Sequence, residues 1–215
     1  MEIIVRKYGG TSLDSIAKIK KIAETTKKSI NEGKKIVLVV SAMGKSTDEL
    51  LKKAKMLSSH PDTRELDLLM SSGEIVSSAL MSIALQELGL KAISLTGFQA
   101  GIDTNSTFGE AQIISIDNKR IHDEINNGQI VVIAGFQGYN ENFEITTLGR
   151  GGSDTTAVAL AASLKADICE VYTDVEGIFT ADPKIVKNAK KIDYLSYEDM
   201  LELANYGAKM HPRSI

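Results

Sequence analysis

The sequence predicts an α/β fold, a three-layer sandwich in which helices cover both sides of a mainly parallel central sheet. Two observations predict it. Short runs rich in β-branched residues alternate along the chain with longer segments of helical periodicity. The short runs are continuously apolar rather than alternating, which is typical of strands that are covered on both faces.

The elements follow in order from this alternation. Strands are expected at Ile3–Arg6, Ile36–Val40, Ala92–Leu95, Ile130–Ala134 and Ile168–Tyr172. Helices are expected at Leu13–Glu32, Leu66–Leu88, Asp117–Asn126, Thr155–Lys165 and Tyr197–Asn205. Gly33 and Gly89 follow the first two helices and are stop signals. The polar segment Tyr139–Thr147 lacks an apolar run and predicts a hairpin.

Composition favours a cytoplasmic enzyme that acts on small molecules. The 215 residues are 43% hydrophobic and 25% charged, with a net charge of −3, so nucleic acid is not an expected partner. No apolar run approaches the ~18 residues of a membrane span, so a membrane is not expected either. Cys169 is the single cysteine, which fits a reducing compartment. His60, His122 and His211 are scattered, so no metal site is expected.

Polar, glycine-bearing segments follow all five expected strands. They are Lys7–Ser12, Ser41–Thr47, Thr96–Gly97, Gly135–Gly138 and Thr173–Gly177. Any one of these segments has an ordinary explanation as a turn. Ligands of open α/β sheets, however, bind beyond the carboxyl ends of the strands. The agreement of five segments therefore favours one shared site at this edge.

Two of the glycine-rich segments are similar in kind. Lys7–Ser12 and Leu148–Thr156 each combine two or more glycines with hydroxyl residues and one cation, Lys7 or Arg150. Glycine lets the backbone approach a ligand closely, and amides near a helix N-terminus attract anions. Two such segments predict a site for two anionic partners, such as a phosphoryl donor and an acidic acceptor.

Several motifs, in order along the whole chain, resemble those of aspartate kinases within the amino-acid kinase family. They are Lys7–Ser12, Val40–Gly44, Arg64–Asp67, Ser72–Glu74, Gly149–Thr155, Thr173–Pro183 and Gly207–Lys209. The resemblance implies the amino-acid kinase fold, with about eight strands in a mainly parallel sheet. It also implies transfer of the γ-phosphoryl group of ATP to the side-chain carboxylate of L-aspartate, the first step of lysine, threonine and methionine biosynthesis.

The resemblance also implies roles for individual residues. Lys7 would neutralise the transferred phosphoryl group, and Asp154 would orient Lys7, Lys209 or a water bound to Mg²⁺. Mg²⁺ would arrive with ATP, held mostly by phosphates and water. Arg150 would clamp the α-carboxylate of aspartate, and Glu74 would receive its ammonium group, although a mid-helix glutamate is ordinarily exposed. The further substrate contacts would be Ser41, Thr47, Phe136, Gly151, Gly152 and Ser153, where Ser153 is equally suited to cap the following helix.

The implied nucleotide contacts lie at both ends of the chain. They are Lys7, Gly9, Gly10, Thr173, Asp174, Phe179, Lys184 and Lys209. The chain departs from the family pattern at three of its positions. Phe179 stands where tyrosine is usual, Lys184 stands where arginine is common, and the segment Lys209–Pro212 is one residue short.

Three alternatives remain. A dinucleotide-binding dehydrogenase is disfavoured, because Gly9 and Gly10 lack the Gly-x-Gly-x-x-Gly spacing. A non-catalytic sensor of amino acids or nucleotides would keep the same binding motifs, although retention of Lys7 argues against it. A kinase for another acidic amino acid would share the motifs as well. A homo-oligomer is compatible with the sequence, which specifies no number of subunits.

Residues 1–215 are expected to form one catalytic domain. In the family, this domain adds a final strand and is followed by regulatory α/β modules that bind lysine or threonine. The sequence ends at Ile215, before both features. Since all five strand-end segments are assigned to substrates, we expect no inhibition by lysine or threonine. Titration of both amino acids into an aspartate-dependent assay measures this, and saturable sub-millimolar inhibition would contradict it.

Overall fold

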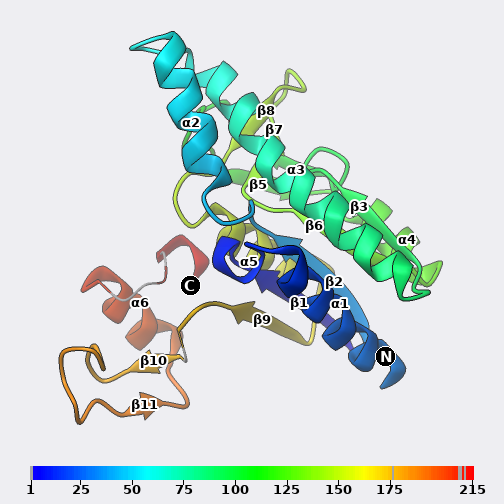
Figure 1. Ribbon diagram of the computed structural model, residues 1–215, viewed down its shortest axis with the longest axis vertical. Helices are drawn as coiled ribbons and strands as arrows, with labels where there is room; N and C mark the ends of the chain where they lie inside the picture. Colours follow the sequence, from blue (N-terminus) through cyan, green and yellow to red (C-terminus); the bar gives the residue numbers. More distant parts are fainter. Residues whose placement is uncertain (1, 176, 208–209, 211) are drawn as a thin grey trace.

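The centre of the fold is a five-stranded parallel sheet (Figure 1). The computed structural model describes residues 2–175, 177–207, 210 and 212–215. The strands of the sheet are β1 (Ile3–Tyr8), β2 (Lys35–Val40), β3 (Ala92–Leu95), β6 (Ile130–Ala134) and β9 (Ile168–Tyr172). Their spatial order is β3-β6-β2-β1-β9 and every pairing is parallel. The carboxyl ends of all five strands therefore lie along one edge.

Helices cover both faces of this sheet, which confirms the predicted three layers. On one face, α1 (Ile16–Asn31) and α3 (Thr63–Glu87) pack against Ile4 and Tyr8 of β1. On the other face, α4 (Lys119–Asn126) and α5 (Gly152–Leu164) share a core with Val5 of β1. Successive strand residues point to opposite faces, so both sets are buried in the inner strands β2 and β6, whereas the edge strand β9 is partly exposed.

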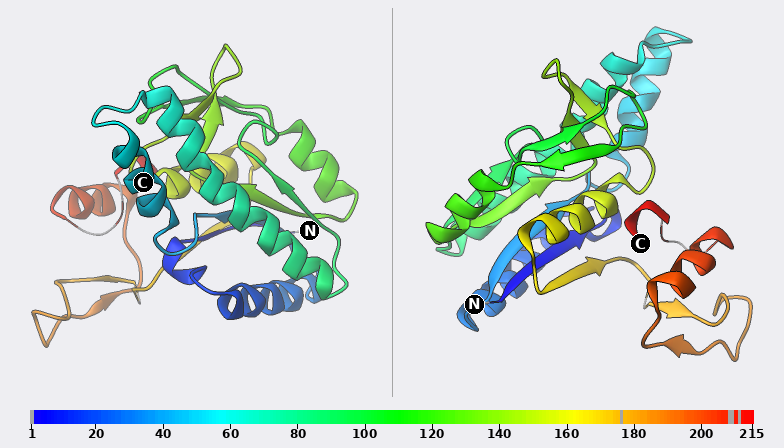
Figure 2. Two further views of the ribbon diagram at one scale, coloured as in Figure 1. Left: turned by 45° about the horizontal axis from the view of Figure 1, so that its top comes forward. Right: turned by 180° about the vertical axis from the view of Figure 1, so that it is seen from behind.

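A second sheet of four strands lies beside the N-terminal half of α3 (Figure 2). Its strands are β4 (Ile102–Thr104), β5 (Ile113–Ile116), β7 (Gln137–Tyr139) and β8 (Ile145–Thr147), in the order β5-β4-β7-β8. The antiparallel pair β7 and β8 is the hairpin that the sequence predicts. Together α3 and this hairpin place polar loops above the carboxyl edge of the central sheet.

The remaining elements extend from the body of the molecule (Figure 2). Helix α2 (Ser46–Leu57) connects the loop after β2 to α3. After β9, the chain forms the small antiparallel pair β10 (Ile178–Phe179) and β11 (Lys191–Ile192), then α6 (Tyr197–Asn205) and a 3₁₀ turn at Pro212–Ser214. This C-terminal arm returns to the body, where the Arg213 guanidinium donates to the Leu148 carbonyl at 3.4 Å.

The sequence predicts the five sheet strands and the five helices α1, α3, α4, α5 and α6 to within a few residues. It does not predict α2, β4, β5, β10 or β11. The sequence of α2 carries a short apolar stripe at Leu50, Ala54 and Leu57, which the prediction overlooked, and none of its twelve residues is buried. The four missed strands have two to four residues each, too few to display a period. The eight-stranded sheet implied by the resemblance is wrong for the described residues, which form five strands in the central sheet.

Helix α3 is the longest element, with 25 residues. By length and composition alone this helix could cross a membrane, contrary to the expectation that no apolar run approaches that length. Its N-terminus is capped by Asp62, which accepts from the amides of Arg64 and Glu65 and explains the start at Thr63. Two carboxylates, Asp67 and Glu74, are buried on its inner face, an arrangement that fits a core helix docked on polar loops.

Candidate active site at the carboxyl edge of the sheet

The turn after β1 leaves space beside a buried cation. A side chain at Gly10 would come within 2.7 Å of the Ala42 carbonyl oxygen, so only glycine fits against the loop after β2. A Cβ at Gly9 would instead lie 3.5 Å from the Lys7 ammonium nitrogen. The volume that glycine leaves free at Gly9 is therefore next to the charge of Lys7, which suits an anion.

Lys7 and Asp154 form a close and largely buried ion pair. The Lys7 ammonium lies 2.7 Å from the Asp154 carboxylate, and only 8% of Lys7 is exposed. Asp154 stands in the first turn of α5, where the helix dipole favours a negative charge. Of the partners considered for Asp154 in the sequence, Lys7 is thus in contact. Lys209 lies outside the described residues.

Glu74 is buried, contrary to the ordinary expectation for a mid-helix glutamate. It is 4% exposed, and Oε1 accepts from the Ala42 amide at 3.1 Å. Oε2 has no hydrogen-bond partner among the described residues. Gly73 permits this close packing, since a Cβ there would lie 2.8 Å from that of Ala42. Burial raises the pKa of the Glu74 carboxyl from 4.5 to about 7. The free oxygen is therefore suited to receive a cationic ligand group.

The hydroxyl residues of the loop after β2 lie near Glu74. The Ser41 amide donates to the Tyr8 carbonyl at 3.1 Å, which fixes the start of this loop against β1. The Thr47 hydroxyl lies 3.9 Å from the Cβ position of Gly73, so it is next to the Glu74 turn of α3. The amide of Gly44 donates to Gly10 at 2.9 Å and joins the first two loops. Ala42 and Thr47 thus border the Glu74 turn of α3, and Ser41 directly precedes Ala42.

Arg150 precedes α5 in a glycine-rich segment with left-handed backbone. Gly149 and Gly151 have φ of 73° and 74°, values that only glycine adopts easily. Gly151 is the residue before the first turn of α5. The side chain of Arg150 is exposed and forms no ion pair within the described part of the chain. An unpaired guanidinium four residues from Asp154 is available for a carboxylate.

Phe136 and Ser153 bring the loop after β6 to the N-terminus of α5. Phe136 has a φ of 69°, which is uncommon and strained for a bulky residue. Its amide donates to the Thr156 hydroxyl at 3.1 Å. A Cβ at Gly152 would lie 2.8 Å from the Phe136 ring, and one at Gly135 would lie 2.9 Å from Ser153. The predicted residues Phe136, Gly152 and Ser153 are therefore packed together.

The predicted nucleotide residues are divided between two places. Thr173 and Asp174 directly follow β9, and the Gly9 amide donates to the preceding carbonyl, that of Tyr172, at 3.4 Å. They consequently adjoin the turn after β1. Phe179 lies in β10 and the exposed Lys184 lies in the loop that follows, so both belong to the C-terminal arm. Within the described part of the chain, neither residue forms a hydrogen bond or ion pair with the Lys7 turn.

A cluster behind Lys7 was not recognised from the sequence. Arg6 is 5% exposed, and its Nε lies 2.6 Å from the carboxylate of Glu170 on β9. The rings of Tyr8 and Tyr172 stack at 4.7 Å, and the Tyr172 hydroxyl donates to Glu170 at 3.1 Å. The sequence did contain a signal for this cluster, because Arg6 is a charged residue within an apolar run. In the sheet, Arg6 pairs with Glu170 and Tyr8 pairs with Tyr172. The cluster holds the two strand ends that carry Lys7 and Thr173.

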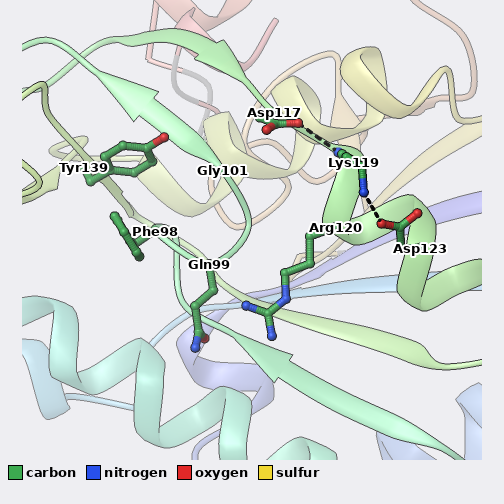
Figure 3. Close-up of a pocket in the computed structure, with 8 residues that line it drawn as sticks. All are labelled: Phe98, Gln99, Gly101, Asp117, Lys119, Arg120, Asp123 and Tyr139. Carbon is green, nitrogen blue, oxygen red and sulfur yellow. Dashed lines mark hydrogen bonds and ion pairs between the residues drawn. The ribbon is translucent and has the colours of Figure 1, made fainter.

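A separate concavity of about 420 Å³ lies between the segment after β3, the start of α4 and β7 (Figure 3). Its walls include Phe98, Tyr139 and Arg120, with Lys119 paired to Asp123 at 2.8 Å. None of the site residues predicted from the sequence lines it. Within the described residues, no three His, Cys, Asp or Glu side chains gather as a metal site would require.

Comparison with known proteins gives a consistent result. The model of the amino acid kinase family matches residues 2–215. The chain is 56% identical to an aspartokinase of Geobacillus stearothermophilus over 216 residues, which is 100% of this chain and 53% of that protein. The chain thus spans about half the length of the curated relatives it matches.

Solved structures agree. A Synechocystis aspartate kinase superposes with a TM-score of 0.87 at 48% identity, covering 99% of this chain and 35% of that one. E. coli aspartokinase III in complex with aspartate and ADP gives 0.86 at 27% identity, covering 99% of this chain and 58% of that one. With the parallel sheet, the two helical layers and the glycine turns beside Lys7 and Arg150, this chain belongs to the amino acid kinase family.

Proposed function

We propose that this protein transfers the γ-phosphoryl group of ATP to the side-chain carboxylate of L-aspartate and releases ADP and 4-phospho-L-aspartate. The observation that carries the proposal is the buried Lys7 ammonium, held by Asp154 at 2.7 Å beside the space that Gly9 leaves. A fixed cation of this kind can neutralise charge on a phosphoryl group in transit. The relatives named aspartokinase, and the E. coli enzyme bound to aspartate and ADP, support the same substrates.

In the proposed arrangement, ATP places its phosphates along the turn after β1. Gly9 and Gly10 give the backbone access to phosphate oxygens, and Thr173 and Asp174 adjoin this turn from β9. Lys7 bridges the transferred group and the attacking carboxylate, while Asp154 orients its ammonium. The reaction needs two repelling anions held in line more than it needs covalent participation by the protein.

Aspartate is proposed to bind between Arg150 and Glu74. The exposed guanidinium of Arg150 matches the α-carboxylate, and the unpartnered Oε2 of Glu74 accepts from the ammonium group. Ser41, Thr47, Phe136 and Ser153 complete this side of the site. With the Glu74 carboxylate at one end of the site and the Arg150 guanidinium at the other, the site would recognise an amino acid rather than a simple dicarboxylate.

Mg²⁺ is part of the proposal as a companion of ATP. When bound, it would neutralise phosphate charge, and its ligands would be phosphate oxygens and water, because the described residues offer no dedicated set. We further propose that residues 1–215 act as one catalytic domain in the cytoplasm, at the first step of lysine, threonine and methionine biosynthesis. A homo-oligomer is compatible with this role.

The decisive experiment couples ADP release to a spectrophotometric signal, with and without L-aspartate. Aspartate-dependent ADP release, together with a hydroxylamine-trappable acyl phosphate, is expected. ADP release with L-glutamate in place of aspartate would indicate a kinase for another acidic amino acid. Binding of ATP and aspartate without turnover would indicate a sensor and contradict the proposal.

The raised pKa of Glu74 makes a prediction for stability without ligand. The folded protein holds this proton more tightly than the unfolded chain, because the folded pKa is about 7 and the unfolded value is 4.5. The unfolding free energy should therefore fall by up to ~3 kcal/mol as pH rises from 4.5 to 7, and then level off. Denaturant unfolding at pH 5 and pH 8 measures this difference. Glu74→Gln should reduce it, and an equal difference in both proteins would contradict the assignment.

The same group makes the opposite prediction for substrate. Pairing with an ammonium requires ionised Glu74, so aspartate should bind more tightly as pH rises through 7, with little pH dependence in Glu74→Gln. Succinate lacks the ammonium group and is the matched probe. Glu74→Gln should weaken aspartate and leave succinate unchanged in calorimetric titration. Equal weakening of both ligands would assign Glu74 a purely structural role.

A further inference from the structure

A second buried carboxylate of α3 lies outside the proposed substrate contacts. Asp67 is completely buried and accepts three hydrogen bonds. Oδ1 accepts from the Thr147 hydroxyl at 2.7 Å, and Oδ2 accepts from the amides of Thr147 at 2.8 Å and Gly109 at 2.9 Å. None of the ion pairs in the described part of the chain involves Asp67. The Asp67 carboxylate is therefore stabilised by neutral hydrogen-bond donors alone, without a cation.

Those donors belong to the segment that carries Arg150. Thr147 is the last residue of β8 and stands three positions before Arg150. Its carbonyl also accepts from the Ala111 amide at 2.9 Å, so both sides of its backbone are held. Gly149 rests on the same partner loop, since a Cβ there would lie 3.0 Å from the Gly109 carbonyl oxygen. Asp67 thus fixes the start of the Arg150 segment and the loop that supports it.

Burying the Asp67 carboxylate costs free energy, so its presence calls for a structural reason. A fully buried carboxylate without a cation loses its hydration, and an apolar residue of similar size would often be as stable. A carboxylate differs in holding several donors in one fixed arrangement. Its neighbour along the same helix face, Glu74, contacts the other side of the proposed aspartate site through Ala42. Helix α3 therefore connects both sides of that site.

We propose that Asp67 is a positioning residue that sets the location of Arg150 for the substrate carboxylate. The inference rests on the proposed function, in which Arg150 binds aspartate. Asp67 itself does not contact the substrate. It acts through Thr147 and Gly109 and determines where the glycine-rich segment leaves β8. Without these hydrogen bonds, Arg150 keeps its charge, but its backbone is no longer held in one position.

Asp67→Asn is the direct test. The substitution keeps the shape but replaces three hydrogen bonds to a carboxylate by weaker ones to a neutral amide, and the amide nitrogen cannot accept from the Thr147 hydroxyl, so the hold on the segment is loosened. Calorimetric titration of the full chain should show aspartate affinity reduced by ~10- to 100-fold and ATP affinity within about twofold of wild type. Hydrogen exchange of residues 147–151 should be faster. Asp103→Asn is the matched control, because its carboxylate accepts a single side-chain bond, from Ser115 at 3.3 Å, in the same sheet.

A second pair of variants covers the case in which Asp67→Asn does not fold. Thr147→Val removes one of the three donors and should weaken aspartate binding in the same direction, and Thr147→Ser, which keeps the hydroxyl, should restore it. Unchanged aspartate affinity in folded Asp67→Asn, or in Thr147→Val if Asp67→Asn is unfolded, overturns the proposal. Absence of aspartate binding by the wild-type chain would reject the proposed function itself, and the exchange measurement would still decide whether Asp67 holds the segment.

Discussion

Lys7→Met is expected to reduce turnover by ~10²–10³ and to weaken aspartate binding far less. Methionine fills a similar volume without the charge, so the loss falls on the step in which phosphoryl charge develops. Single-turnover and steady-state measurements with saturating ATP and aspartate separate the two effects. Retention of more than half of the activity would show that Lys7 does not stabilise the transferred group.

The design must separate catalysis from folding, because Lys7→Met leaves the partly buried Asp154 without its partner. The double variant Lys7→Met/Asp154→Asn removes that uncompensated charge and should recover stability but not turnover. Lys119→Met is the matched control. Lys119 and Asp123 are 2.8 Å apart, but both side chains are substantially exposed. Its turnover should stay within about twofold of wild type, since such pairs contribute little.

Arg150→Lys is expected to raise the aspartate KM by ~10- to 100-fold and to leave the ATP KM nearly unchanged. Lysine keeps the charge but cannot form two parallel hydrogen bonds to one carboxylate. Initial rates across both substrates give the two constants. An equal rise in both would move Arg150 to the nucleotide side of the site.

Arg120→Lys is the control for this variant, because Arg120 lines the separate concavity at the start of α4 (Figure 3). Its sole ion pair among the described residues is a long one, with 3.8 Å between Arg120 Nε and the Glu124 carboxylate on the same helix, and it has no assigned role. Both KM values should match wild type. A selective rise in the aspartate KM for Arg120→Lys, with Arg150→Lys unaffected, would place aspartate binding in that concavity instead.

Local patterns were sufficient for the central sheet. The runs at Ala92–Leu95, Ile130–Ala134 and Ile168–Tyr172 coincide with β3, β6 and β9. Burial on both faces explains the unbroken apolar sequence of β6, whereas the edge strand β9 is partly exposed and is recognised by its β-rich residues. Patterns failed where burial is small. Strands β10 and β11 have two residues each, too few to display a period. Helix α2 buries none of its residues, and its short stripe at Leu50, Ala54 and Leu57 was overlooked.

The site divides in the same way. The sequence by itself determined the loops that meet at the carboxyl edge, the glycine turns beside Lys7 and Arg150, and the residue types available for two anions. Glycine conformation and residue type are local properties, and the meeting of the loops follows from the general rule for open α/β sheets, whereas the spatial order of the strands was not predicted. It did not determine the state of Glu74, which is exposed by helical expectation and buried in the fold.

Only the tertiary structure decided which distant groups share an environment. Lys7 and Asp154 are 147 positions apart in the sequence yet 2.7 Å apart in space. Asp67 and Thr147 are 80 positions apart and share two hydrogen bonds. No local pattern encodes these distances, because they arise when α3 and α5 dock on the sheet and remove the carboxylates from water. Removal from water raises the pKa of Glu74. The same docking of α3 places Asp67 where it can hold the segment that carries Arg150.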